Sequence, residues 1–215
     1  MALSRDVENQ IKTVAELEDV VGVPLPKVAA KARGVLDPID VQWISRSPFI
    51  LIATSGADGS CDVSPKGDPA GFVQVIDEHT IAVPERPGNR RADGYRNVLE
   101  NPHVGVIFLV PPRNDTLRVN GRARLVRDAP YFDAMVVKGH RPILALEVTV
   151  EEVYFHCAKA FMRSELWKHE RWDGDGLPST AEIARRLIWN EEKSQAELDQ
   201  YYGTSYAERL YRDVR

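Results

Sequence analysis

The sequence predicts a mainly β fold, a small antiparallel barrel of six or seven strands with few helices, most of them peripheral. Short apolar or alternating segments follow one another between turn signals, without the long helix that would follow each strand of a parallel sheet. Seven of the fourteen prolines fall between residues 65 and 112, which is typical of turns and strand edges. A chain of 215 residues, 43% of them hydrophobic, can bury such a core without disulfides or metals.

Helical or irregular structure is expected before the strands begin. Residues 8–33 show helical spacing that Pro24 and Pro26 interrupt. A short helix over residues 39–47 should end at Pro48, because the residue before a proline disfavours the helical conformation.

Two hairpins follow. Residues 49–54 form a continuous apolar run, as in a buried strand. The Asp58-Gly59 pair after it is a strong turn signal, so the chain should return antiparallel. A second turn, at Asp77-Glu78, separates two further apolar runs. The four expected strands are 49–54, 61–65, 71–76 and 80–83.

Three longer strands complete the expected barrel. Residues 104–110 are apolar and end at Pro111-Pro112. Residues 116–126 alternate, which is the pattern of a half-buried strand, and residues 143–156 form the last strand. In the alternating strand, one face holds Leu117, Val119, Gly121, Ala123 and Leu125, and the other holds Arg118, Asn120, Arg122 and Arg124. Helices are expected at 90–100, 130–138 and 158–169, and two more are expected within 180–211.

Charge is distributed unevenly along the chain. The formal net charge is −4, which disfavours a general nucleic-acid binder. Residues 86–127 nevertheless hold nine basic residues against three acidic ones, a local charge of +6, whereas both ends of the chain are acidic. All nine are arginines, whose planar guanidinium suits phosphate and carboxylate groups. A positive centre between acidic ends favours one small anionic ligand over a long polyanion.

Several well-known sites are absent from the sequence. It has no GxGxxG, P-loop or GxSxG motif, which disfavours dinucleotide-binding, NTPase and α/β-hydrolase functions. No metal site is expected, because HExxH and CxxC are missing and the adjacent His156 and Cys157 would point to opposite faces of a strand. Two cysteines, no membrane-length apolar run and no signal-like N-terminus predict a cytoplasmic protein without a membrane partner.

The first candidate for a binding site is the segment 61–71, which follows the first hairpin turn. Strand alternation would turn Val63 toward the core, while Ser64 and Lys66 offer a hydroxyl and a cation. Pro65 interrupts the ladder and leaves backbone groups available to a flat, hydrogen-bonding ligand. The alternative is a plain edge strand with a proline break.

The second candidate is the segment 84–97. A Pro-Gly turn delivers Asn89, Arg90 and Arg91 to the N-terminus of an expected helix. Arginines there oppose the helix dipole, and a bound phosphate would remove the conflict. Ion pairing with Asp93 is the alternative reason for their presence.

The third candidate is the segment 160–172, which contains two of the four tryptophans. In a continuous helix Arg163 and Trp167 would share one face, with Lys159 nearby. A cation beside a large aromatic ring can cover a planar ligand or a partner subunit. The alternative is an amphipathic packing helix.

These three stretches, in this order around a small barrel, resemble the FMN-binding split-barrel family related to pyridoxamine 5′-phosphate oxidase, in its bacterial flavin-nucleotide-binding branch. The resemblance is carried by TSGADGSCDVSPKGD, RPGNRRADGYRNVLENPHVGVIFLVPP, LRVNGRARLV and AFMRSELW. It covers residues 41–172 and implies a split-barrel domain with flanking helices there. Outside the resemblance, the residue pattern predicts a helical or irregular extension over 1–40 and a helical appendage over 173–215.

The resemblance further implies a homodimer that holds FMN in a cleft between two barrels, as an FMN-dependent oxidoreductase acting on a small molecule or electron donor. The residues expected to line the isoalloxazine ring are Asp62, Val63, Ser64 and Lys66. Those expected to hold the phosphate are Arg86, Asn89, Arg90 and Arg91. Those expected near the subunit interface and the partner's flavin are Lys159, Arg163 and Trp167, and Arg118 is a further cofactor candidate.

Other readings stay open. The arginine-containing C-terminal segment of true pyridoxamine phosphate oxidases has no match beyond Trp172, so the vitamin substrate is not carried over. The protein could instead bind or sense a flavin nucleotide without catalysis. It could also bind haem or a deazaflavin, with His103, His140 or His156 available as an axial haem ligand. Nucleic-acid binding through the arginines would make affinity steeply salt-dependent, and the acidic ends disfavour it.

Overall fold

The computed structural model describes residues 9–211, which divide after Ala32 into two compact units. The first eight residues of the expected N-terminal extension and the last four of the C-terminal appendage lie outside the described residues. The expected domain boundaries at residues 40 and 172 stay predictions.

Two short helices make up the described part of the first unit. Helix α1 (Val14–Val21) begins with a capping box between Thr13 and Glu16, and Gly22, with φ +82°, follows its last residue. Helix α2 (Pro26–Ala29) has its proline at the first helical position, where the missing N–H costs nothing. Pro26 therefore begins a helix here. No residue of either helix is buried.

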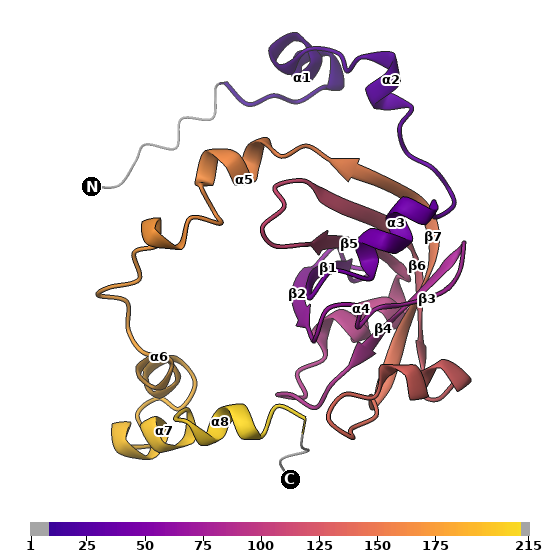
Figure 1. The fold of residues 1–215 in the computed structure, drawn as a ribbon. Helices are drawn as coiled ribbons and strands as arrows, with labels where there is room; N and C mark the ends of the chain where they lie inside the picture. Colours follow the sequence, from indigo (N-terminus) through magenta and orange to yellow (C-terminus); the bar gives the residue numbers. More distant parts are fainter. Residues whose placement is uncertain (1–8, 212–215) are drawn as a thin grey trace. The chain divides into compact units, whose positions relative to one another are not determined.

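The second unit is built on one seven-stranded antiparallel sheet, which forms the split barrel of a mainly β fold (Figure 1). Its spatial order is β2-β1-β5-β6-β7-β4-β3, and each neighbouring pair is antiparallel. The predicted mainly β class and the upper end of the predicted strand count are confirmed. The strands are β1 (Phe49–Ser55), β2 (Cys61–Gly67), β3 (Gln74–Asp77), β4 (Thr80–Glu85), β5 (His103–Leu109), β6 (Thr116–Val126) and β7 (Leu144–His156).

One face of the sheet forms the hydrophobic core. The alternation predicted for β6 is confirmed, because Leu117 and Val119 are buried while Arg122 and Arg124 are exposed. Side chains of the other strands complete the same cluster, among them Ile50, Ile52, Ile81, Val83, Val106, Phe108, Leu146 and Val148. Burial of these apolar groups is the main driving force for this fold.

Helix α3 (Pro38–Ile44) packs on this core through Trp43 and Ile44. Its N-cap is Asp37, and its buried Asp40 accepts two hydrogen bonds from the Arg33 guanidinium, at 2.8 and 3.0 Å. The buried carboxylate is thus paired, as a charge removed from water must be.

A bulge interrupts the pairing of β6 with β7 between Asn120 and Gly121. There the two backbones approach so closely that a Cβ on Gly121 would lie 1.9 Å from the carbonyl oxygen of Thr149. Glycine is therefore required by contact with the main chain of the neighbouring strand.

The peripheral helices differ from expectation. Residues 130–138 give a 3₁₀ helix, η1 (Pro130–Met135), instead of an α-helix. Helix α5 (Lys159–Ser164) is much shorter than the predicted 158–169, because Glu165 takes a left-handed conformation with φ +51°; a 3₁₀ turn, η2 (His169–Arg171), follows. Three helices rather than two follow residue 180: α6 (Thr180–Leu187), α7 (Gln195–Tyr201) and α8 (Ser205–Glu208). Within residues 9–211 no helix combines the length and apolar character needed to cross a membrane.

Candidate functional site

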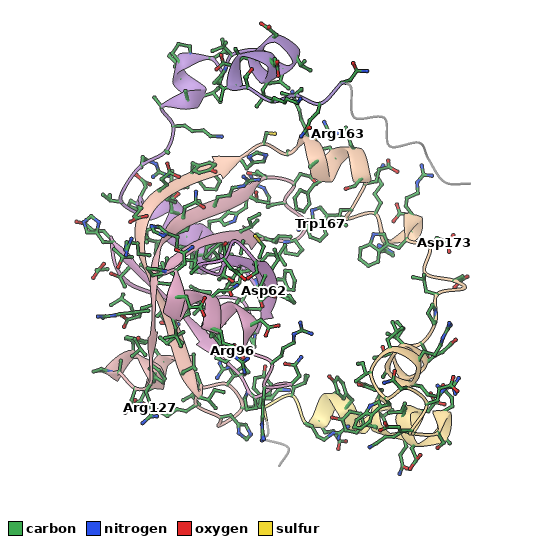
Figure 2. All side chains as sticks on the ribbon, turned by 180° about the vertical axis from the view of Figure 1, so that it is seen from behind. Asp62, Arg96, Arg127, Arg163, Trp167 and Asp173 are labelled. Atoms are coloured by element: carbon green, nitrogen blue, oxygen red, sulfur yellow. The ribbon has the colours of Figure 1, made fainter. Side chains whose placement is uncertain are left out.

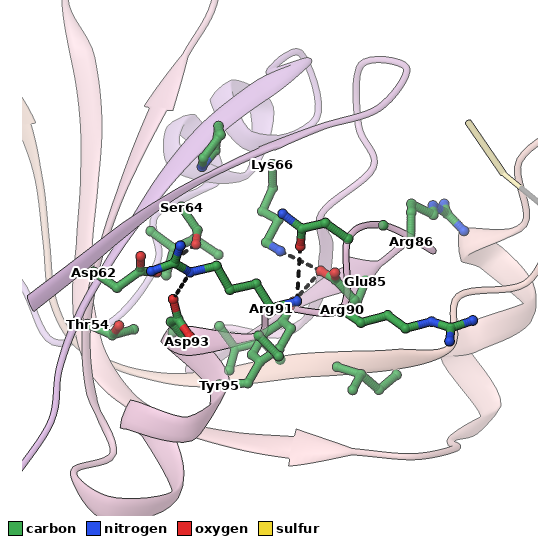
Figure 3. Close-up of a pocket in the computed structure, with 18 of the residues that line it drawn as sticks. Thr54, Asp62, Ser64, Lys66, Glu85, Arg86, Arg90, Arg91, Asp93 and Tyr95 are labelled. Carbon is green, nitrogen blue, oxygen red and sulfur yellow. Dashed lines mark hydrogen bonds and ion pairs between the residues drawn. The ribbon is translucent and has the colours of Figure 1, made fainter. Parts of the chain in front are cut away.

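A cavity of about 580 Å³ opens in the second unit between β2, the end of β4 and the loop that follows β4 (Figure 3). Side chains of β1, the first turn of helix α4 (Asp93–Glu100) and the beginning of β7 complete its wall. The volume lies within the range of about 300–1,000 Å³ that is usual for small-molecule sites.

The polar wall of the cavity is one face of β2. Asp62, Ser64 and Lys66 alternate along this strand and share the less exposed face, and Ser64 Oγ donates to Asp62 Oδ2 at 2.7 Å. Val63 borders the cavity, but its residue is 61% exposed, so the expectation that it faces the core is wrong. The reason is that β2 is an edge strand whose polar face, not its apolar one, turns inward.

Glu85 joins the polar groups at the floor of the cavity. Its Oε2 accepts from Lys66 Nζ at 2.5 Å and also from the hydroxyl of Tyr95. Lys66 Nζ lies 4.9 Å from the centre of the Tyr95 ring. Burial, together with the neighbouring Glu85 carboxylate, raises the pKa of the Tyr95 phenol far above its ordinary value. The phenol therefore stays a hydrogen-bond donor at any physiological pH.

The loop 86–92 forms the mouth of the cavity and carries the adjacent arginines. Arg90 and Ala92 both have positive φ, at +62° and +54°, a conformation that non-glycine residues rarely adopt. Asn89 Oδ1 accepts from the Arg91 main-chain N–H at 3.0 Å, and the Arg91 guanidinium pairs with Asp93. The predicted helix over 90–100 thus begins only at Asp93, and the arginines precede it.

Electrostatics favour a helix start at Asp93. Asp93 places an acidic group in the first turn of α4, where the helix dipole favours it. The ion pair named as the alternative reason for the arginines is therefore present. Arg91 is nevertheless 79% exposed, so solvent screens the pair, and another anion can replace Asp93 as the partner of Arg91.

Gly94 allows the first turn of α4 to lie directly against β2. A Cβ at this position would come within 2.9 Å of Asp62 Oδ2 and 3.4 Å of Thr54 Oγ1. The main-chain N–H groups of Asp93 and Gly94 have no partner four residues earlier within the helix. The N-terminus of this eight-residue helix therefore faces the same space as the polar face of β2.

Arg86 lies at the cavity wall but is engaged in the fold. Its Nε donates to Asp68 at 2.6 Å, Nη2 to the Met135 carbonyl at 2.7 Å and Nη1 to the His140 carbonyl at 3.3 Å. The side chain is only 13% exposed, and its guanidinium is directed away from Lys66 and Glu85 (Figure 3). Of the four predicted phosphate-holding residues, Arg86 is the one that anchors the loop.

The remaining predicted residues lie outside this cavity. Arg118 projects from the polar face of β6, and Lys159 begins helix α5 after β7. Arg163 and Trp167 belong to the same segment after β7 (Figure 2). The expectation that Arg163 and Trp167 share one helix face is wrong, because α5 ends at Ser164. Trp167 instead donates from Nε1 to the Arg113 carbonyl at 2.8 Å and stacks on Phe161.

The three histidines named for haem ligation do not line the cavity either. His103 contacts Asn101 and Arg122, and His140 stacks on Tyr211. His156 ends β7, beyond the cavity-lining part of that strand.

Sequence reasoning missed several lining residues, namely Thr54, Glu85, Gly94, Tyr95 and Leu144. Glu85 ends an apolar strand, and nothing local marks it as the partner of Lys66. A positive signal existed only for Gly94, as a glycine inside an expected helix.

Comparison with known proteins identifies a matching family. A family model described as pyridoxamine 5′-phosphate oxidase matches residues 37–157, which is more than half of the chain. No curated protein matches the chain.

Solved structures show weaker likenesses. A putative pyridoxamine 5′-phosphate oxidase from Lactobacillus delbrueckii is 23% identical with a TM-score of 0.46, over 58% of this chain and 98% of that one. HupZ of Group A Streptococcus is 18% identical with a TM-score of 0.45, over 56% and 93%. An FMN-binding protein from Syntrophomonas wolfei is 15% identical with a TM-score of 0.41, over 55% and 89%.

Proposed function

Because the chain belongs to the pyridoxamine 5′-phosphate oxidase family, we propose that it is a flavoprotein that binds FMN in the cavity between β2 and the loop 86–92. We propose further that it acts as an oxidoreductase on a small molecule and holds the flavin at a homodimer interface. The observation that carries the proposal is the joining of two features in one cavity: a polar strand face and a loop with adjacent arginines.

The mouth of the cavity suits the phosphate of FMN. Arg90 and Arg91 precede the first turn of α4, whose main-chain N–H groups and dipole favour an anion. A phosphate can take the place of Asp93 as the partner of the exposed Arg91, because the present pair is solvent-screened. Arg86 would act here through its bonds to the main chain, by holding the first residue of the loop.

The face of β2 suits a flat ring with both donors and acceptors along its edge. Ser64 donates its one proton to Asp62, so both side chains offer acceptors, and the Lys66 ammonium offers donors, all within the cavity wall. When bound, FMN would supply the two-electron chemistry, while the protein supplies position and electrostatics. Lys66, which pairs with Glu85 and lies over the Tyr95 ring, would supply a positive charge from the cavity wall.

A homodimer would give a role to the predicted residues outside the cavity. Lys159 and Arg163 are exposed on α5, and Arg118 is half-buried on the polar face of β6. We propose that these residues and Trp167 lie at the subunit interface, where they would face the partner's cofactor.

The test is a flavin titration of the purified protein, followed by flavin absorbance and fluorescence. In the Arg90→Ala/Arg91→Ala variant two charged hydrogen-bond donors are lost, each worth about 1.5–3 kcal/mol. The FMN dissociation constant should therefore rise roughly a hundredfold or more. Turnover with NADH or NADPH and oxygen would then distinguish an enzyme from a flavin carrier.

A matched control removes two exposed arginines elsewhere. Arg127→Ala/Arg186→Ala changes the net charge by the same amount, and both residues lie outside the cavity; Figure 2 shows Arg127 well away from Asp62. The control should keep the affinity of the unsubstituted protein. A protein that binds no FMN would refute the proposed function, and equal affinity in both double variants would refute the phosphate assignment.

A further inference from the structure

The C-terminal appendage contacts the anchor of the cavity loop. The hydroxyl of Tyr211 donates to Asp68 Oδ1 at 2.6 Å, across 143 residues of sequence. Tyr211 lies ten residues beyond the end of α7 and outside the stretch that the family model matches. A residue from outside the stretch that the family model matches thus contacts Asp68, the partner of Arg86.

Asp68 connects Tyr211 to the loop. Its side chain is 2% exposed, and its second oxygen, Oδ2, accepts from Arg86 Nε at 2.6 Å. The Asp68 carboxylate therefore accepts one hydrogen bond from Tyr211 of the C-terminal appendage and one from Arg86, the first residue of the loop 86–92. Without the Tyr211 hydroxyl, a buried acceptor would lose its partner, which costs more than the hydrogen bond itself contributes.

The aromatic ring of Tyr211 is held on several sides. His140 stacks on it with ring centres 6.2 Å apart and planes 15° apart, and Arg86 Cζ lies 5.7 Å from its centre. Lys138 Nζ lies 5.6 Å from the same centre. Two cations near one ring add cation–π attraction to the hydrogen bond.

The loop depends on its two ends for its shape. Its interior holds the left-handed Arg90 and Ala92, a conformation that persists only where the surroundings impose it. One end is α4, and the other is Arg86 with its bonds to Asp68 and to two carbonyl groups. What holds Arg86 therefore helps to hold Arg90 and Arg91.

We propose that Tyr211 is a positioning residue that, through Asp68 and Arg86, fixes the loop 86–92 in the conformation that binds the phosphate of the cofactor. The C-terminal appendage would thus be a strap for the site, and ligand affinity would depend on its docking. The identity of the ligand in this inference rests on the proposed function, whereas the effect of Tyr211 on the conformation of the loop does not.

The experiment compares Tyr211→Phe, which removes only the hydroxyl, with Tyr206→Phe as a matched control. Tyr206 is exposed and contacts Tyr201, Tyr202 and Arg209, so the same substitution there leaves the loop alone. FMN affinity should fall about tenfold in Tyr211→Phe, which corresponds to about 1.4 kcal/mol. Affinity for riboflavin, which has no phosphate, should stay unchanged, and the control should match the unsubstituted protein for both ligands.

A second readout follows the loop without any flavin. Trypsin cleaves after arginine, so cleavage after Arg90 and Arg91, identified by mass spectrometry, reports how often the loop opens. The Tyr211→Phe variant should be cleaved there several times faster than the control. Tyr211→Ala, which also removes the ring, should be cleaved at least as fast.

The outcomes separate the two proposals. Equal FMN affinity in Tyr211→Phe and in the control would overturn the strap, as would an equal loss of FMN and riboflavin binding. If the unsubstituted protein binds no FMN, the proposed function fails, and the cleavage rates alone decide. Faster cleavage in Tyr211→Phe would still support the strap, and equal cleavage rates would overturn it.

Discussion

Gly121, which lies on β6 opposite the bulge of β7, offers a stringent test of the fold. In Gly121→Ala the added Cβ would lie 1.9 Å from the Thr149 carbonyl oxygen, 3.0 Å from its carbon and 3.3 Å from the Glu151 nitrogen. All three atoms are main chain, so no side chain can rotate away. Contacts of a Cβ below 3.0 Å essentially do not occur, so β6 and β7 must separate by at least 1.1 Å, the difference between the two distances.

The expected cost follows from this separation. Overpacking a well-packed core costs about 1–3 kcal/mol. Ladder hydrogen bonds lost on each side of the bulge add about 0.5–1.5 kcal/mol apiece. We therefore expect Gly121→Ala to lower the free energy of unfolding by about 3 kcal/mol or more, a large part of the roughly 5–15 kcal/mol typical of a domain.

Urea unfolding followed by tryptophan fluorescence would measure the change. Gly105→Ala is the matched control, because Gly105 lies in the neighbouring strand β5 and its added Cβ would meet only the Asn120 side chain, at 3.3 Å. That side chain can move, so the control should change stability by about 1 kcal/mol or less. If both variants lose the same stability, the close approach at the bulge is refuted.

Two smaller predictions concern single side chains. Tyr95 has its pKa raised by burial and by Glu85, so in the folded protein Tyr95→Phe should leave unchanged the number of tyrosines that ionise between about pH 9 and 11. Because the pKa is raised, the stability that Tyr95 contributes is fully present below the pKa of a free phenol, about 10, and is lost as the pH rises beyond it. If Tyr95→Phe instead removed one tyrosine from those that ionise between about pH 9 and 11, the buried pair of Tyr95 and Glu85 would be contradicted. Asp37→Ala removes the N-cap of α3, whose carboxylate accepts a hydrogen bond from Ile39 N at 2.9 Å. The free energy of unfolding in urea should fall by about 1 kcal/mol, and an unchanged midpoint would show that the cap contributes nothing.

Prediction succeeded where local patterns are strong. The alternation in 116–126 and the Asp58-Gly59 turn located β6 and the first hairpin to within a few residues. It failed at helix ends, because Glu165 and Ala92 take left-handed conformations that no local propensity of these residues indicates. The stretch after β7 is therefore a short helix with a turn, and the arginines precede α4.

The candidate site was predicted in part. Asp62, Ser64, Lys66, Asn89, Arg90 and Arg91 were expected in one site, and the structure brings them to one cavity. Val63 was misplaced because alternation shows which residues share a face of a strand, but not which face turns inward on an edge strand.

By itself, the sequence determined where the strands lie and which residues share a face, because the period of two is a property of consecutive residues. Only the tertiary structure decided which polar groups meet. Lys66 and Glu85 lie on strands that are not neighbours in the sheet, and Tyr211 reaches Asp68 across most of the chain. Such contacts depend on how distant strands and the C-terminal helices pack together, and no local pattern encodes that arrangement. The cavity's charge network and the proposed strap are for this reason visible only in the folded chain.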